Sequence, residues 1–416
     1  MSRVLDVYLH KRFVGKLIQG DAGRLQFDYD EDYILSETSV PVSLSLPIRS
    51  QPYEEQNVRA FFSGLLPDDL ARHRLARYLG VSEKNPFSLL EAIGGECAGA
   101  LTLYPEGYHP PSPKSEDVEK LDSHQLREVL ELLKERPLLG GTDNIRLSLA
   151  GAQDKIAVSL VDNCIALVQG TTPTSHILKP LIAGVKDSVH NELFCLRLAK
   201  LLNIETPHAE VRWLEGTPYF LIERYDRIFE AGTGIKRLHQ EDFCQALGIL
   251  PELKYEREGG PGIAQSLGLL QQYSLRPAAD QLAFIQRIIF NYLIGNSDAH
   301  GKNYSLLYRE RQPTLAPAYD LLCTAIYPHL SRKMAMKIGG KYDPDSVFLR
   351  HWHQLVPQTA ASRRALNKNL MKMSKDCLEQ SSNLKIILKE EGVQSAIFDD
   401  VCHVIRKRGE HILGEI

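Results

Sequence analysis

The chain lacks the features that identify a secreted, membrane-spanning or zinc-binding protein. Its seven cysteines are scattered over 416 residues and include no Cys-x-x-Cys pair, so neither a disulfide framework nor a zinc site is indicated. No uninterrupted apolar run approaches the roughly 18 residues of a membrane helix, and the start MSRVLDVYLHK contains no signal-peptide stretch. We therefore expect a protein that stays in the reducing cytoplasm.

An excess of one charge is also missing. Lys and Arg total 49 against 52 Asp and Glu, which gives a net charge of −3. Such a balance provides no global attraction to nucleic acid or to an anionic membrane, so any such binding needs a local patch. The chain has no internal repeat and no GxxxxGK[ST] motif, which disfavours a Walker-type NTPase.

What is present is 43% apolar residues, enough for a sizeable core and for two or three domains. Between residues 3 and 46, the short alternating runs RVLDVYL, GRLQFDY and VSLSL predict a small antiparallel sheet, and ALTLY at 100–104 predicts its closing strand. Between them lies a helical pattern divided by Pro67. The polar, proline-rich segment YHPPSPKSED at 108–117 predicts a linker.

The second half begins with the helical pattern LDSHQLREVLELLKE and continues with strand-like runs in LSLAGAQDKIAVSLV, CIALVQ and SHILKP. Beyond about residue 227 the pattern is mostly helical. We therefore predict an α+β protein. Its domains are an N-terminal β-containing subdomain at 1–110, a strand-rich lobe with a nucleotide-binding loop at 118–226, and a helical lobe at 227–416.

The sharpest functional signal lies between residues 281 and 320. Apolar residues at helical spacing predict a buried helix that stops at a Gly-Asn dipeptide, and a polar loop follows it. In this loop Asp298 is separated from Asn303 by four residues. YSLLY and TLAPAYD then predict two short strands, the second of which leads to Asp320. If these strands pair, the three oxygen-bearing side chains converge.

Phosphoryl transfer needs such a convergence, because Mg²⁺ must neutralise the charge of a loose transition state while a carboxylate accepts the hydroxyl proton. The D-x-x-x-x-N spacing matches the second half of a protein-kinase catalytic loop, and Asp320 takes the position of the metal-binding Asp of DFG. The next residues are Leu321 and Leu322, so the DFG letters are absent. Taken singly, Asp298 and Asn303 are ordinary turn residues, but their ordered spacing behind a buried helix favours a kinase centre.

The nucleotide side carries weaker signals. LSLAGAQDKIAVSL at 147–160 predicts a hairpin whose turn offers backbone N–H groups to phosphates, although a plain hairpin fits the segment as well. Lys179 is placed to neutralise phosphates and Glu192 to pair with it, the alternative being two exposed charges. The backbone near Glu223 and Tyr225 is a candidate adenine contact, with a plain buried strand as the alternative.

Long, ordered motifs over nearly the whole chain resemble the HipA family, the kinase toxins of bacterial type II toxin–antitoxin pairs. These motifs are SVPVSLSLP, FFSGLLPDD, NPFSLLEAIGGECAGALTLYP, LSLAGAQDK, PTSHILKP, LIERYDR, EGGPGIA, LIGNSDAHGKNYS and APAYD. The resemblance implies a two-lobed protein-kinase-like fold with an additional N-terminal subdomain, and a protein serine/threonine kinase that uses ATP and Mg²⁺. In the family Asp298 would be the catalytic base, and Asn303 and Asp320 the magnesium ligands.

The resemblance also implies roles for the other site residues. Ser148 would be an autophosphorylation site, and a phosphate of about −1.5 to −2 charges beside the phosphate loop would repel ATP and switch the enzyme off. The expected nucleotide contacts are Leu149, Ala150, Gly151, Ala152, Gln153, Asp154 and Lys155 of the phosphate loop, Lys179, the adenine hinge Glu223, Arg224 and Tyr225, and His300, Lys302 and Tyr319.

Partners are implied in the same way: a HipB-type helix-turn-helix antitoxin dimer, operator DNA bound through that complex, and a protein substrate that is an aminoacyl-tRNA synthetase, such as glutamyl-tRNA synthetase. Growth arrest would follow from blocked translation. A basic helical face at Arg363, Arg364, Lys368 and Lys372 fits a solvated surface better than a DNA contact. The alternatives are a small-molecule phosphotransferase, disfavoured by the N-terminal motifs, and an inactive co-repressor subunit, disfavoured by the intact kinase residues.

Overall fold

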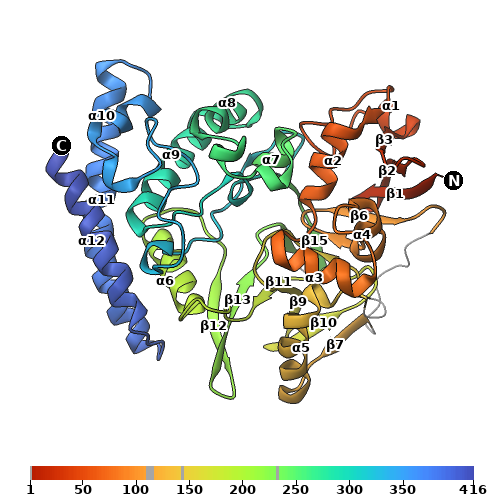
Figure 1. Ribbon diagram of the computed structural model, residues 1–416, viewed down its shortest axis with the longest axis horizontal. Helices are drawn as coiled ribbons and strands as arrows, with labels where there is room; N and C mark the ends of the chain where they lie inside the picture. The colour runs from red at the N-terminus through yellow and green to blue at the C-terminus, as the bar shows by residue number, and fades with distance from the viewer. Residues whose placement is uncertain (1, 109–116, 142–144, 231–233) are drawn as a thin grey trace. The chain divides into compact units, whose positions relative to one another are not determined.

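The computed structural model describes residues 2–108, 117–141, 145–230 and 234–416, so most of the predicted linker lies outside the described residues. The chain forms two compact units, each assembled from three separated segments (Figure 1). The first unit comprises Met1–Pro180, Trp213–Glu252 and Leu306–Pro313; the second comprises Leu181–Arg212, Leu253–Ser305 and Thr314–Ile416. The three domains drawn from the sequence stay a prediction.

An antiparallel sheet of order β4-β3-β2-β1-β6 opens the first unit. Strands β1 and β6 pair in antiparallel register, which confirms the predicted N-terminal sheet and its closing strand. Helices α2 and α3 lie on either side of Pro67, as predicted. The elements are β1 (Arg3–Leu9), β2 (Arg12–Gln19), β3 (Leu25–Tyr29), α1 (Glu31–Leu35), β4 (Tyr53–Glu54), α2 (Glu55–Gly64), α3 (Asp69–Leu79), α4 (Pro86–Ile93) and β6 (Leu101–Pro105).

The strand predicted at VSLSL is wrong, because this segment forms a turn closed by an isolated bridge between Ser43 and Leu46. The carboxylate of Glu241 accepts hydrogen bonds from the Leu44 N–H, at 3.0 Å, and from the Ser43 hydroxyl. Burial raises the pKa of Glu241 to about 7. The bonds to Glu241 take the place of the backbone hydrogen bonds that a strand makes with its neighbour. The alternation of apolar and polar residues in VSLSL reports which side chains are buried, and it does not show whether a neighbouring strand is present.

A second sheet in this unit has the order β13-β11-β9-β10-β7, and the chain returns to the unit within β12. The hairpin predicted at 147–160 is wrong: β8 pairs in parallel with β5, while β9 pairs with β10 and β11. The elements are β5 (Glu96–Cys97), β7 (Val118–Lys120), α5 (Ser123–Glu135), β8 (Leu147–Ser148), β9 (Ile156–Val161), β10 (Cys164–Val168), β11 (His176–Lys179), β12 (Ala209–Leu214), β13 (Thr217–Glu223), β14 (Arg227–Glu230), β15 (Gly234–Arg237), β16 (His239–Asp242) and α7 (Phe243–Ala246).

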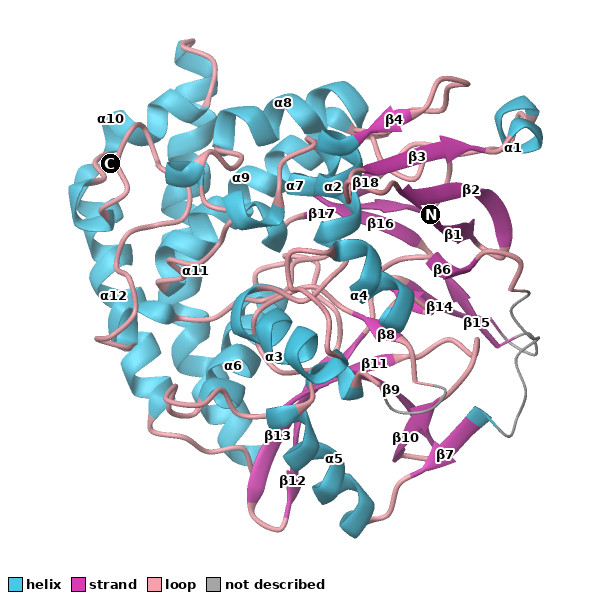
Figure 2. Cartoon of the chain, turned by 45° about the vertical axis from the view of Figure 1, so that its right-hand side comes forward, coloured by secondary structure: helices cyan, strands magenta, loops and turns pink. Residues whose placement is uncertain are grey.

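The second unit is mainly helical, as predicted for the C-terminal part (Figure 2). Its longest helices, α11 and α12, pack against each other and against α6 and α9. Among the described residues, no helix combines the length and apolar character needed to cross a membrane. The elements are α6 (Ser188–Leu201), α8 (Ile263–Tyr273), α9 (Pro277–Ile294), β17 (Ser305–Tyr308, which continues into the first unit), β18 (Thr314–Leu315), α10 (Leu349–Trp352), α11 (Ala360–Glu390) and α12 (Ile397–Glu415).

Candidate active site

The loop of the predicted catalytic residues starts from a fixed point at the end of α9. Gly295 caps this helix with a φ of +78°, and a Cβ at this position would lie 2.8 Å from Val404 Cγ1 and 2.9 Å from Ala325 Cβ. Only glycine fits both the left-handed conformation and the space. The Asn296 N–H then donates to the Asn291 carbonyl at 2.9 Å. The loop therefore leaves a closed, buried helix end.

Asn296 joins the predicted base to the predicted metal ligand. Its Oδ1 accepts the Asp298 N–H at 3.0 Å, and its Nδ2 donates to the Asp320 carbonyl at 3.3 Å and to Asn291 Oδ1 at 3.0 Å. One buried amide thus holds the backbone of both acidic residues. The sequence indicates only a helix stop at this position, so this role was missed.

The structure brings Asp298 and Asn303 together, as the spacing predicts. The Asp298 carbonyl accepts hydrogen bonds from Asn303 Nδ2 at 3.0 Å and from the His300 N–H at 2.8 Å. Because the amide nitrogen of Asn303 is engaged, its Oδ1 is the atom left for a metal, and oxygen is the ligand that Mg²⁺ prefers. The Asp298 carboxylate is exposed, and its Oδ1 accepts the hydroxyl of Tyr255 at 2.6 Å.

Asp320 has a φ of +50°, a left-handed conformation that costs a residue other than glycine roughly 1 kcal/mol. Strain of this kind persists where neighbouring groups fix the backbone, and it gathers at functional sites. The Ala316 N–H donates to the Ser305 carbonyl at 2.8 Å. This bond pairs the segment that follows Asn303 with the segment that leads to Asp320. Asp298, Asn303 and Asp320 therefore belong to one unit, as predicted.

The donor set fits a magnesium ion that is shared with a nucleotide. Among the described residues there is no group of three or more His, Cys, Asp or Glu side chains suited to holding a metal. One carboxylate and one amide oxygen, from Asp320 and Asn303, leave the remaining positions to phosphate oxygens and water. Mg²⁺ is usually bound in this way at phosphoryl-transfer sites.

The other predicted residues of this unit shape the loop. The rings of His300 and Tyr255 lie edge to face, with centroids 5.1 Å apart. The Tyr319 hydroxyl donates to the Lys302 carbonyl at 2.7 Å and lies 2.6 Å from the Ser305 hydroxyl. Nucleotide contacts by His300, Lys302 and Tyr319 stay a prediction. Tyr255 was missed, because nothing in the sequence links it to a loop 43 residues away.

In the first unit, the predicted phosphate loop lies against the end of α2 and the start of α3. Ser148 is fully buried, and its hydroxyl donates to the Leu65 carbonyl at 2.7 Å. Further along, the Asp68 N–H donates to the Gly151 carbonyl at 3.2 Å. An ion pair between Arg74 and Asp154 fixes the far side of the loop. The motif FFSGLLPDD, which includes Leu65 and Asp68, therefore supports this loop.

The loop is also closed by its own side chains. Lys155 Nζ donates to the Ala150 carbonyl at 2.7 Å, and Gln153 Nε2 donates to the Pro180 carbonyl at 3.1 Å. Gly151 has a φ of +108°, a backbone conformation that residues with a side chain rarely adopt. The glycine is thus required by the geometry of the loop. Contacts of residues 149–155 with ATP stay a prediction.

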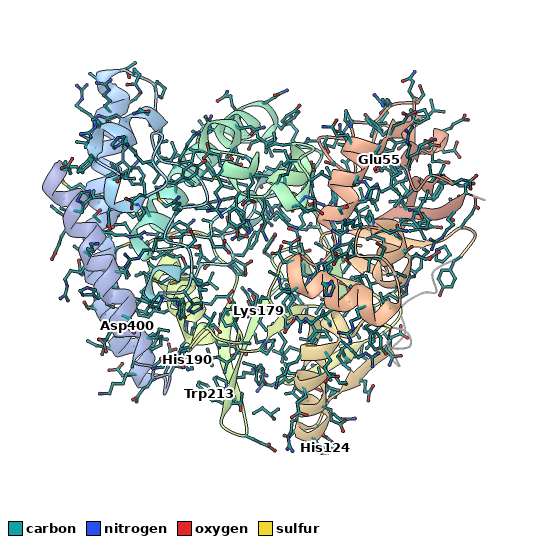
Figure 3. The ribbon with its side chains drawn as sticks, in the orientation of Figure 1. Glu55, His124, Lys179, His190, Trp213 and Asp400 are labelled. Carbon is teal, nitrogen blue, oxygen red and sulfur yellow. The ribbon has the colours of Figure 1, made fainter. Side chains whose placement is uncertain are left out.

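Lys179 and Glu192 are both buried, with exposed fractions of 4% and 5%. Lys179 ends β11 (Figure 3), and its Nζ lies 5.8 Å from the centroid of the Phe220 ring. Glu192 lies in α6 of the second unit. Burial argues against the alternative of two exposed charges, because isolated buried charges are costly. Their pairing stays a prediction.

Arg224 of the predicted hinge is engaged by protein groups. Its guanidinium donates to both carboxylate oxygens of Asp226, at 3.0 and 2.9 Å, and to Glu96 Oε1 at 3.3 Å. Its N–H donates to the Ser175 carbonyl at 3.0 Å, and its own carbonyl accepts the Arg227 N–H at 3.2 Å. Glu223 and Tyr225, both partly exposed, are therefore the stronger candidates for an adenine contact.

Comparisons with known proteins show the family to which the chain belongs. The HipA N-terminal domain model matches residues 5–104 and the HipA-like C-terminal domain model matches residues 147–381. The chain is 45% identical to the putative kinase Y4mE of Sinorhizobium fredii over 341 residues, 81% of each chain. It is 29% identical over 386 residues to the serine/threonine-protein kinase toxin HipA of Shewanella oneidensis, covering 89% of this chain and 87% of that protein.

The fold agrees as well. A solved structure of Shewanella oneidensis HipA with HipB and its operator DNA superposes with a TM-score of 0.85 at 26% identity, covering 99% of this chain and 97% of that one. The fold and the relatives therefore define an enzyme of the protein serine/threonine kinase class, and the predicted α+β fold is confirmed. The chain belongs to the HipA family.

Proposed function

We propose that this chain is an ATP- and Mg²⁺-dependent serine/threonine kinase that acts as the toxin of a toxin–antitoxin pair. The observation that carries the proposal is the Asn296 amide, which bonds to the backbone of both Asp298 and Asp320. A base and a metal ligand held by one rigid group meet the main demand of phosphoryl transfer, which is positioning.

Each side chain has a role in this mechanism. The Asp298 carboxylate accepts the proton of the substrate hydroxyl, and the Tyr255 hydroxyl fixes the orientation of that carboxylate. Asn303 Oδ1 and Asp320 would hold Mg²⁺, which when bound supplies charge neutralisation for the transferred phosphoryl group. Lys179 and the loop at 149–155 would hold the nucleotide phosphates.

The partners are proposed from relatives. The Shewanella HipA structure contains HipB and operator DNA, so we propose a HipB-type antitoxin for this chain, autorepression through DNA bound by that complex, and a cytoplasmic location. The substrate would be an aminoacyl-tRNA synthetase, such as glutamyl-tRNA synthetase. Arg363, Arg364, Lys368 and Lys372 are all exposed on α11, and Lys372 pairs with Asp376, which supports a solvated face.

Incubation with labelled ATP, Mg²⁺ and a cell lysate tests the proposed function. We expect label in a discrete protein band, because the substrate class is a protein hydroxyl. Asp298→Ala, treated in parallel, should leave that band unlabelled. Label in a metabolite would favour a small-molecule phosphotransferase, and no labelled product would favour an inactive co-repressor. Mass spectrometry of the band would name the target.

Ser148 should be phosphorylated by the enzyme itself, at the expense of its own activity. Its hydroxyl is fully buried against the Leu65 carbonyl, so a phosphate with about −1.5 to −2 charges cannot be accommodated in place and must displace β8. Intact-mass measurement after expression should show phosphate on the wild type and none on Ser148→Ala. Phosphate on Ser148 in Asp298→Ala would contradict self-phosphorylation.

A further inference from the structure

Asn191 of α6 is fully buried, and its side chain forms hydrogen bonds with the backbone of the segment that follows Asp320. Its Oδ1 accepts the Cys323 N–H at 2.9 Å, and its Nδ2 donates to the Cys323 carbonyl at 3.0 Å. Two bonds to the donor and acceptor of one residue imitate the pairing that a neighbouring strand provides. They fix both the position and the orientation of the Cys323 backbone.

The amide is used completely. Its second hydrogen is donated to the Tyr327 hydroxyl at 3.0 Å, and that hydroxyl donates to the Lys186 carbonyl at 2.8 Å, just before α6. The Cys195 thiol, one helical turn further along, donates to Asn191 Oδ1 at 3.5 Å. An asparagine amide offers two donor hydrogens and one acceptor oxygen, and all of them have partners here. No smaller or apolar side chain reproduces this set.

The same segment is held from its other side by the loop that leads to Asp298. The Thr324 hydroxyl accepts the Ser297 N–H at 2.8 Å and donates to the Gly295 carbonyl at 3.1 Å. The Ala325 N–H donates to the same carbonyl at 3.0 Å. Residues 323–325 are therefore fixed between α6 and the loop that leads to Asp298, and only Leu321 and Leu322 separate them from Asp320 in its left-handed conformation.

We propose that Asn191 is a positioning residue of the magnesium site, which holds Asp320 in its strained backbone conformation by fixing Cys323. The proposal rests on the proposed kinase function. Strained conformations persist only where the surroundings over-determine them, and Asn191 supplies one of these constraints. Another constraint is the Asn296 bond to the Asp320 carbonyl.

The position of Asn191 in the chain links its bonds to Cys323 with a second predicted site residue. The next residue along α6 is Glu192, the predicted partner of Lys179. A shift of α6 that moves Glu192 therefore also pulls on Cys323. Kinases need both the Lys–Glu pair and the metal-binding Asp in place, so we expect α6 to carry both the glutamate of the predicted pair and the side chain that fixes the segment after Asp320.

The test compares the Mg²⁺ requirement of three variants at saturating ATP. Asn191→Leu keeps the branched shape and the number of heavy atoms but makes none of the bonds. It should raise the Mg²⁺ concentration for half-maximal transfer about tenfold or more, the effect typical of losing a group that orients a metal ligand. Tyr327→Phe keeps both bonds to Cys323 and should change the requirement little. Leu198→Ala is the control, because it removes a buried apolar side chain of the same helix and should lower the Tm with the Mg²⁺ requirement unchanged.

Hydrogen exchange supplies a readout that does not depend on activity. In nucleotide-free protein, the Cys323 and Ala325 amides of Asn191→Leu should exchange faster than those of Leu198→Ala at equal global stability. Asn191→Leu matching Leu198→Ala in both measurements would overturn the positioning role. A wild type that transfers no phosphate would instead refute the proposed function, and the exchange data would still decide whether Asn191 fixes Cys323.

Discussion

Asp320→Ala and Asp298→Ala should both lower phosphoryl transfer by about three orders of magnitude, and only the first should also weaken Mg-ATP binding. Asp320 would contribute a carboxylate to the metal, so its loss removes a ligand before the reaction begins. Asp298 would act on the proton of the attacking hydroxyl, so its loss leaves the ground-state complex intact. Transfer rates and a nucleotide-binding titration at fixed Mg²⁺ separate the two effects.

A matched control for this pair is Asp400→Ala, which removes an exposed carboxylate from the first turn of α12 (Figure 3). It should bind Mg-ATP and turn over like the wild type. Normal turnover in either Asp298→Ala or Asp320→Ala would remove the mechanism. Equal weakening of Mg-ATP binding in both would place Asp298 at the metal and leave the base unidentified.

The parts of the site that follow local patterns could be predicted from the sequence. The helical spacing before Gly295 fixes where α9 ends, and the D-x-x-x-x-N spacing sets Asp298 and Asn303 on one short loop. The pairing seen between Ser305 and Ala316 follows from two short apolar runs joined by a turn. Each of these signals extends over a few residues, the range within which backbone geometry and burial dictate the pattern.

The positioning residues escaped prediction because their partners are distant in the chain. Asn191 and Cys323 are 132 residues apart, and Tyr255 and Asp298 are 43 apart. No local sequence pattern around an asparagine in a helix or a tyrosine in a loop indicates a partner so far away in the chain. The wrong hairpin at 147–160 has the same origin, because β8 pairs with β5 and the strand pattern does not name its neighbour.

A second set of long-range partners is the buried charge cluster around Glu96 of β5, whose side chain should contribute strongly to the stability of the fold. Glu96 Oε1 accepts bonds from Arg227 Nη2 at 2.5 Å, from Arg224 Nη1 at 3.3 Å and from the Thr174 hydroxyl at 3.1 Å. Asp226 is the second carboxylate of the cluster, and both arginines pair with it. Burial alone would raise the pKa of Glu96, but the charges of Arg227 and Arg224 hold it below its ordinary value.

Glu96→Ala should therefore lower the free energy of unfolding by about 3–5 kcal/mol at pH 7, because two buried arginines would share the one remaining carboxylate. Glu91→Ala is the control: its ion pair with Arg3 is partly exposed, so its loss should cost about 0–1 kcal/mol. Urea unfolding of the three proteins measures both values. A loss for Glu96→Ala no larger than that for Glu91→Ala would show that the cluster contributes little to stability.

The pH dependence of the same measurement follows from the lowered pKa of Glu96. A carboxyl whose folded-state pKa lies below its unfolded value stabilises the fold above the unfolded pKa, about 4, and loses that contribution as the pH falls through the folded pKa. The difference between wild type and Glu96→Ala should thus be largest near neutral pH and shrink in acid. Because β5 pairs with the strand that carries Ser148, Glu96→Ala should also release the phosphate loop, and transfer should fall before global unfolding begins.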